Sequence, residues 1–167
     1  SGNVITAGKL GIGFTDTNIK VGSTALDSLT TGGNNVAVGN ATLTANTGGS
    51  QNTAVGGEAL DANTTGNYNS AVGRNALGQN TTGSSNTAVG QYALDGNTTG
   101  DQNVAIGVNA LLTADASYNV AIGYDCMKLN TTGNSNVSVG YQCMDANTTG
   151  NANCAVGTGA LGANTTS

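Results

Sequence analysis

The feature that most constrains this chain is a repeat of 17 residues. An asparagine recurs at 18, 35, 52, 69, 86, 103, 119, 136 and 153, and every interval is 17 residues except the one from 103 to 119, which is 16. The shared pattern is N-x-A-V-G-x-x-A-L-x-x-N-T-T-G-x-x, and we number its positions from one to seventeen, starting at this asparagine. A short fixed period indicates units that stack on one another. The sequence therefore predicts a leader or cap segment over 1–17 and a nine-unit repeat region over 18–167.

The first five positions of each unit predict a short β-strand. The fourth position is Val or Ile in all nine units, and the second position faces the same side of a strand because side chains alternate with a period of two. We expect the fourth position to be buried. The third position is Ala in seven units and the fifth is Gly in all nine. The side chains on that opposite face are small enough for another backbone to approach closely.

The second half of the unit carries another apolar pair. The eighth position is Ala or Cys in eight units, and the ninth is Leu or Met in all nine. This pattern fits either a single helical turn or a second short strand, and the residues leave both open. The Thr-Thr-Gly that follows predicts a surface turn in either case.

A unit of this length cannot form a core of its own, so burial has to come from stacking. We expect an all-β, parallel β-solenoid of nine 17-residue coils spaced about 4.8 Å apart, joined by backbone hydrogen bonds. Stacking would also place asparagines of the first and twelfth positions in ladders along the axis. In the short unit, Ala114-Asp115-Ala116 replaces Asn-Thr-Thr-Gly. We expect a tightened turn there, with the register of the stack preserved.

The charge of the chain argues against nucleic acid as a partner, and its lack of long apolar stretches argues against membrane insertion. The net charge is −5, and the four basic residues are Lys9, Lys20, Arg74 and Lys128. These cannot form a patch that neutralises several phosphates. No stretch approaches the roughly 18 apolar residues of a membrane span, so we expect no membrane insertion.

The residue types needed for catalysis or metal binding are scarce. The chain has no His and no Cys-x-x-Cys motif, which argues against zinc. Glu58 and Asp61 are the closest carboxylate pair, but they do not recur in other units. We therefore predict no catalytic residue, no metal site and no cofactor, and we do not expect an enzyme.

The three cysteines are interpreted as residues that fill the core. Cys126 and Cys143 occupy the eighth position of consecutive units, and Cys154 occupies a second position. The first two would be close enough for a disulfide, which requires Cα atoms about 4.4 to 6.8 Å apart. Parallel in-register stacking rarely orients the Cβ atoms for that bond, so we expect free, buried thiols.

The repeat resembles two groups of fibrous surface proteins. The segments Asn86 to Gly90, Asn103 to Gly107 and Asn119 to Gly123 resemble the shorter repeat of trimeric autotransporter adhesin heads, which are left-handed parallel β-rolls built from three chains. The full unit, preceded by Lys9 to Gly13, is similar to repeats of phage and marine-virus tail-fibre proteins. This resemblance covers 18–167 and the first part of the leader. It implies a left-handed, homotrimeric fibre on a virion surface or, alternatively, on a bacterial cell surface.

The function predicted from the repeat and this resemblance is a structural fibre shaft. The first alternative is a trimeric adhesin head that binds a host glycan or receptor, and the second is an ice-binding solenoid whose recurring threonines contact ice. Receptor contacts would come from the variable sixth and seventh positions, notably Arg74, Tyr92, Tyr124 and Tyr141. We expect the three chains of a homotrimer to meet through the third-position Ala and fifth-position Gly, a flat and uncharged face.

Overall fold

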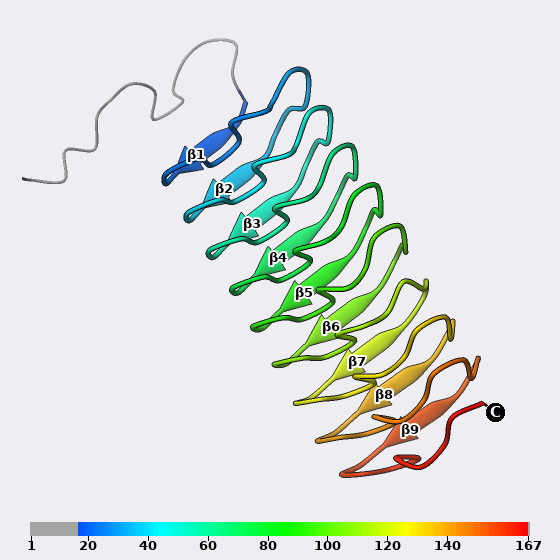
Figure 1. The fold of residues 1–167 in the computed structure, drawn as a ribbon. Coiled ribbons are helices and arrows are strands. Elements are labelled where there is room, and N and C mark those ends of the chain that lie inside the picture. The colour runs from blue at the N-terminus through cyan, green and yellow to red at the C-terminus, as the bar shows by residue number, and fades with distance from the viewer. Residues whose placement is uncertain (1–16, 167) are drawn as a thin grey trace, which may run out of the picture.

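The computed structural model describes residues 17–166, and in that range nine short strands lie in a single row along a rod (Figure 1). The expected all-β, parallel β-solenoid is confirmed. The leader proposed for 1–17 lies, apart from Thr17, outside the described residues, as does Ser167. The strands are β1 Ile19–Val21, β2 Val36–Val38, β3 Thr53–Val55, β4 Ser70–Val72, β5 Thr87–Val89, β6 Val104–Ile106, β7 Val120–Ile122, β8 Val137–Val139 and β9 Cys154–Val156.

Each strand pairs in parallel with the next strand of the chain, and equal repeat positions lie opposite each other. The sheet order is β1 to β9 without a crossover. The register holds across the short unit, because Val104 of β6 pairs with Val120 of β7. The missing residue is absorbed entirely in the turn, which confirms the expectation that the stack continues through this unit.

The core lies on the opposite side of the strands from the one expected. The third-position alanines are buried; Ala71 and Ala88, for example, are 0% exposed. The fourth position is half exposed, with Val72 at 41% and Ile106 at 39%, so the prediction that it is buried was wrong. The face of Ala and Gly, expected to be the contact surface between chains, is the interior of the coil. The alternation of side chains correctly predicted that the second and fourth positions share one side of the strand. It does not determine which side of the strand faces the core.

The alanines face inward because the interior of the coil is narrow. The ninth-position Leu or Met reaches into the interior from the other half of the unit, and Leu60, Leu77 and Leu94 are 0% exposed. These side chains share one core cluster with the strand alanines. Interiors are close-packed, so once a Leu fills each layer, only an Ala-sized side chain fits on the strand opposite.

The second half of the unit is neither a helical turn nor a strand. It runs as successive turns in which the seventh and ninth positions have positive φ, as in Tyr92 at 57° and Leu94 at 55°. Alternating left-handed residues point the peptide groups along the rod: the Tyr92 N–H donates to the Arg74 carbonyl of one neighbouring coil (3.0 Å), and the Leu94 N–H to the Ala110 carbonyl of the other (2.9 Å). A left-handed residue costs roughly 1–2 kcal/mol, which these hydrogen bonds offset.

Two buried asparagine ladders run through the stack, as expected from the first and twelfth positions. At the twelfth position, Asn80 Nδ2 donates to Asn63 Oδ1 of the preceding coil (2.8 Å) and to the Gly83 carbonyl of its own coil (3.0 Å). At the first position, Asn52 Nδ2 donates to the Gly66 carbonyl (2.8 Å), which ties the start of a coil to its end. Its backbone N–H donates to Asn35 Oδ1 (2.9 Å), which joins one coil to the next.

The twelfth-position ladder is interrupted in the short unit. Ala114 stands where an asparagine is expected, and the buried Asn97 Oδ1 has no hydrogen-bond partner among residues 17–166. On the other side, Asn130 Nδ2 donates to the Gly133 carbonyl of its own coil (2.9 Å). An asparagine at position 114 could accept from Asn130 and donate to Asn97.

We therefore expect Ala114→Asn to stabilise the fold. Each restored buried hydrogen bond should contribute about 1 kcal/mol, which would be visible as a rise in the midpoint of urea unfolding. Ala146→Asn, at an eleventh position outside the ladder, is the control and should leave the midpoint nearly unchanged. A lower midpoint for Ala114→Asn would contradict the inference that an asparagine at position 114 completes the ladder.

A second prediction concerns the invariant fifth-position glycine. Gly90 has a φ of +133°, and a Cβ added there would lie 2.5 Å from the Gly107 carbonyl oxygen of the next coil. Gly90→Val should therefore be strongly destabilising, since both the backbone angle and the space exclude a side chain. Gln91→Val, at the adjacent exposed position, is the matched variant. Equal melting temperatures for the two variants would refute the argument.

Candidate functional site

Tyr124 and Tyr141 form one candidate contact surface, on the turn that follows the strand. They occupy the sixth position of consecutive coils, and their rings stack with centroids 5.6 Å apart and planes inclined by 11°. Both rings are about half exposed, at 47% and 51%. The structure thus brings these two predicted residues together as an accessible aromatic pair. Stacked pairs of this kind contribute about 0.5–1.5 kcal/mol beyond the area they bury.

Arg74 and Tyr92 form a second, separate group. The Arg74 guanidinium lies 5.8 Å from the centroid of the Tyr92 ring, and its Nη1 donates to the Tyr92 hydroxyl (3.2 Å). Nη2 lies 3.6 Å from Glu58 Oε2. The group links three consecutive coils, and its charged side chains are half exposed, so the ion pair contributes little to stability. Glu58, considered above as half of a carboxylate pair, is paired here with a cation.

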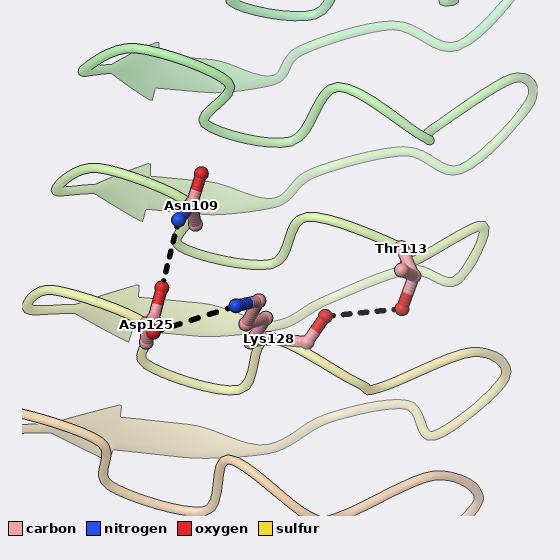
Figure 2. A network of polar contacts seen from close by, with 4 residues as sticks. All are labelled: Asn109, Thr113, Asp125 and Lys128. Atoms are coloured by element: carbon pink, nitrogen blue, oxygen red, sulfur yellow. Dashed lines mark hydrogen bonds and ion pairs between the residues drawn. The ribbon is translucent and has the colours of Figure 1, made fainter.

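A polar network beside Tyr124 was not anticipated from the sequence (Figure 2). Asn109 Nδ2 donates to Asp125 Oδ1 (2.8 Å), and Lys128 Nζ lies 3.5 Å from Asp125 Oδ2. Thr113 Oγ1 donates to the Lys128 carbonyl (3.0 Å). These residues occupy variable positions, so no repeat signal marks them. The network ties the turn that carries Tyr124 to the preceding coil and so restrains the aromatic pair.

Asp115 replaces a backbone carbonyl in the short unit. Where two full-length units follow each other, the thirteenth-position carbonyl accepts N–H groups from the preceding coil, as Thr98 O accepts from Thr81 (2.9 Å) and Thr82 (3.2 Å). Here Asp115 Oδ1 accepts the N–H groups of Thr98 (3.1 Å), Thr99 (2.8 Å) and Gly100 (3.1 Å). The Thr98 hydroxyl donates to Oδ2 (2.6 Å). One carboxylate therefore closes the gap left by the missing residue.

These contacts set the pKa of Asp115. Burial raises the pKa, but the hydrogen bonds from the Thr98 hydroxyl and from the N–H groups of Thr99, Thr98 and Gly100 outweigh it and hold the pKa below its ordinary value. Asp95 shows the opposite balance: burial raises its pKa above the ordinary value, although hydrogen bonds from Gln79 and from the Gly78 N–H oppose the shift.

Side chains at the sixteenth position also accept hydrogen bonds from coil to coil. The shared repeat pattern did not reveal this, because the residue at this position varies. Asn67 Oδ1 accepts the Ser50 N–H (2.8 Å), and Ser84 Oγ accepts the Asn67 N–H (3.1 Å). Asp101 Oδ1 accepts the Ser84 N–H in the same way (2.7 Å). The signal was available in the sequence, because Ser, Asn or Asp fills this position from Ser50 to Asn151. Any short side chain with an acceptor oxygen serves.

The cysteines divide into two buried thiols and one exposed thiol, and all three are free. Cys126 and Cys143 fill the core as expected, and Cys126 Sγ lies 3.1 Å from Ser138 Oγ. Burial raises the pKa of the Cys126 thiol, which makes it unreactive. Cys154 is exposed, so its interpretation as a core residue was wrong: the second position faces outward together with the fourth.

The remaining chemistry of the described region is sparse. Among residues 17–166, no three His, Cys, Asp or Glu side chains gather in a way that could hold a metal ion. In the same range no helix has the length and apolar character needed to cross a membrane.

Asp115 should make the stability of the rod depend on pH. A carboxyl group whose folded-state pKa is lowered adds stability above its ordinary pKa of 3.8, and this is lost as pH falls through the lower folded value. We expect Asp115→Asn to lower the melting temperature at pH 6, and the difference from the native side chain to shrink below about pH 3.8.

Both proteins in that comparison should carry Asp95→Asn, because Asp95 shifts stability in the opposite direction with pH. Melting followed by circular dichroism between pH 3 and 7 measures the effect. A difference that stays constant over this range would show that the charge of Asp115 plays no part.

Comparison with known proteins identifies no family for this chain. No protein-family model, no curated protein and no solved structure matches it at a significant level.

Proposed function

We propose that this chain is a structural shaft module of a virion appendage such as a tail fibre, acting as a homotrimer at the virion surface. The observation that carries the proposal is the continuous stack of coils: the strand ladder and asparagine side chains bind each described coil to the next. Sixteenth-position acceptors add a further bond between consecutive coils as far as the coil of β8. A bacterial cell surface is the alternative location.

A stack of this kind provides length and stiffness. Bending the rod would stretch hydrogen bonds on one side at every coil, because the strands and turns all bond along the same axis. The nine described strands, at about 4.8 Å each, span roughly 40 Å. Extending the rod requires only further copies of the unit, since each coil contacts only its neighbours.

The resemblance of the repeat to tail-fibre proteins and adhesin heads supports the trimer and the surface location. Energetics favour association too. Per coil, the described interior holds one Leu or Met and small residues such as Ala, while ordering each residue costs about 1–2 kcal/mol in backbone entropy. Further burial between chains would add stability that a single rod lacks.

The alternative of an adhesin head is supported by one observation, the exposed pair of Tyr124 and Tyr141. Aromatic side chains on a restrained turn are suited to contact a sugar ring. An ice-binding role has less support, because thirteenth-position hydroxyls are engaged along the fibre: Thr81 Oγ1, for example, donates to the Thr98 carbonyl (2.9 Å). Freezing-point hysteresis of the purified protein tests that third function directly.

The shaft role predicts a stiff, inert rod. Electron micrographs should show straight particles of uniform width, and the folded chain should resist trypsin, although Lys20, Arg74 and Lys128 lie in the described coils. A glycan array should show no binding above background. Glycan binding that disappears in Tyr124→Ala but persists in Tyr68→Ala, an exposed tyrosine at a different repeat position, would favour the adhesin head instead.

A further inference from the structure

The outer side of the β-sheet is an uncharged and mostly apolar surface. Two side chains of each of the nine strands, at the second and fourth repeat positions, point away from the core, which gives eighteen side chains without a single charge. We call this surface the strand face. Its second-position residues are Ile19, Val36, Thr53, Ser70, Thr87, Val104, Val120, Val137 and Cys154, and its fourth-position residues are Val21, Val38, Val55, Val72, Val89, Ile106, Ile122, Val139 and Val156.

The strand face is open to solvent in a single chain. Val21 is 48% exposed, Val89 38% and Val137 40%. Parallel sheets are almost always covered on both faces. In this chain the turns of the same coil cover only the inner face of the sheet, which carries the third-position alanines. A strip of this length and composition on a soluble protein marks a contact surface.

We propose that the strand face is the interface between copies of this chain, which pack on one another parallel and in register. The inference rests on the homotrimer of the proposed function and adds where its chains meet. It replaces the Ala and Gly face, which lies inside each coil.

The spacing of the strand face identifies a second copy as its occupant. A partner has to offer apolar groups about every 4.8 Å along roughly 40 Å, and the face itself has this repeat. Neither side carries a charge, so like faces meet without repulsion or desolvated ions. The eighteen side chains approach the 20–30 residues per side found in stable interfaces.

The polar residues of the strand face favour the parallel arrangement. Thr53, Ser70 and Thr87 occupy the second position of three consecutive strands, whereas their counterparts in β6 to β8 are valines. In a parallel, in-register assembly hydroxyls face hydroxyls and can bond to one another. In a fully overlapped antiparallel assembly, Thr53 would face Val120 and Ser70 would face Val104. Those hydroxyls would then be buried without partners, which is unfavourable.

Cys154 allows a test of this arrangement without any mutation. It is the exposed thiol of the strand face, while Cys126 and Cys143 are buried. Parallel, in-register packing brings the Cys154 side chains of different copies to the same level along the rod. Packed sheets usually lie about 10 Å apart. A bis-maleimide that spans this distance should therefore join two chains. We expect covalent dimers on a denaturing gel, and none from Cys154→Ser.

Ile19→Cys in the Cys154→Ser background is the second cross-linking variant and should also yield dimers, because it reports on the other end of the face. An antiparallel assembly would place position 19 opposite position 154 and would give dimers only when both cysteines are present. That result would overturn the parallel arrangement, and failure of every variant to cross-link would overturn the interface.

Charge introduced on the strand face gives an independent readout. Val72→Asp together with Ile106→Asp should reduce the mass measured by light scattering from the oligomer to the 16.2 kDa monomer, with the circular dichroism spectrum retained. Gln79→Asp, at an exposed position outside the face, should leave the mass unchanged.

These outcomes separate the inference from the proposed function. An oligomer that survives both aspartates would show that the chains meet elsewhere, while the trimeric shaft stands. A native chain that is monomeric would refute both the interface and the trimer, and its shape in electron micrographs would still test the shaft.

Discussion

The hydrogen bonds that join equal positions of consecutive coils are the interaction on which the rest of this structure depends. Along the strands they are short and uniform, as in the bond from the Val36 N–H to the Asn52 carbonyl (2.8 Å). Because each position meets its own copy above and below, a residue must be compatible with itself at a spacing of about 4.8 Å. Gly at the fifth position satisfies this through close backbone approach, and asparagine at the twelfth satisfies it by serving as donor and acceptor at once. The same rule explains why three different acceptors, Ser, Asn and Asp, interchange at the sixteenth position.

Buried polar groups, rather than a large apolar core, give the interior its specificity. The asparagines of both ladders are almost entirely enclosed, and most of their amide groups are paired. An unpaired amide in the interior is costly, so a slip of one residue in register would leave many of them unsatisfied. Ala and Leu fill the remaining space but would tolerate such a slip far better. The short unit shows how the rule can be met with a different residue, since the Asp115 carboxylate accepts the N–H groups that a backbone carbonyl accepts elsewhere.

The surface divides into parts with different chemistry. The strand face is uncharged over the whole described length and mostly apolar, which suits a long contact with a surface of the same period. The turns that follow the strands carry local groups that occur once: the stacked Tyr124 and Tyr141, and the chain of contacts from Glu58 through Arg74 to Tyr92. A contact repeated in every coil suits assembly, whereas a feature confined to two or three coils suits recognition of a partner. The proposed shaft uses the first, and the adhesin alternative would use the second.

The sequence by itself determined the architecture, because a repeat of 17 residues with invariant Gly, Asn and Leu or Met allows little else than stacked coils in fixed register. It also identified both asparagine ladders, the continuation through the short unit, and the tyrosines that share a repeat position. Only the tertiary structure decided which side of the strand faces the core, because alternation relates Val72 to Ser70 without relating either to the interior. The ninth-position side chains settled it, because they take up most of that interior: Leu77 and the small Ala71 are buried there, and the larger Val72 lies outside. The Asn109–Asp125–Lys128 contacts and the role of Asp115 likewise lay beyond the sequence, since they join variable positions that only the closed coil brings within hydrogen-bonding distance.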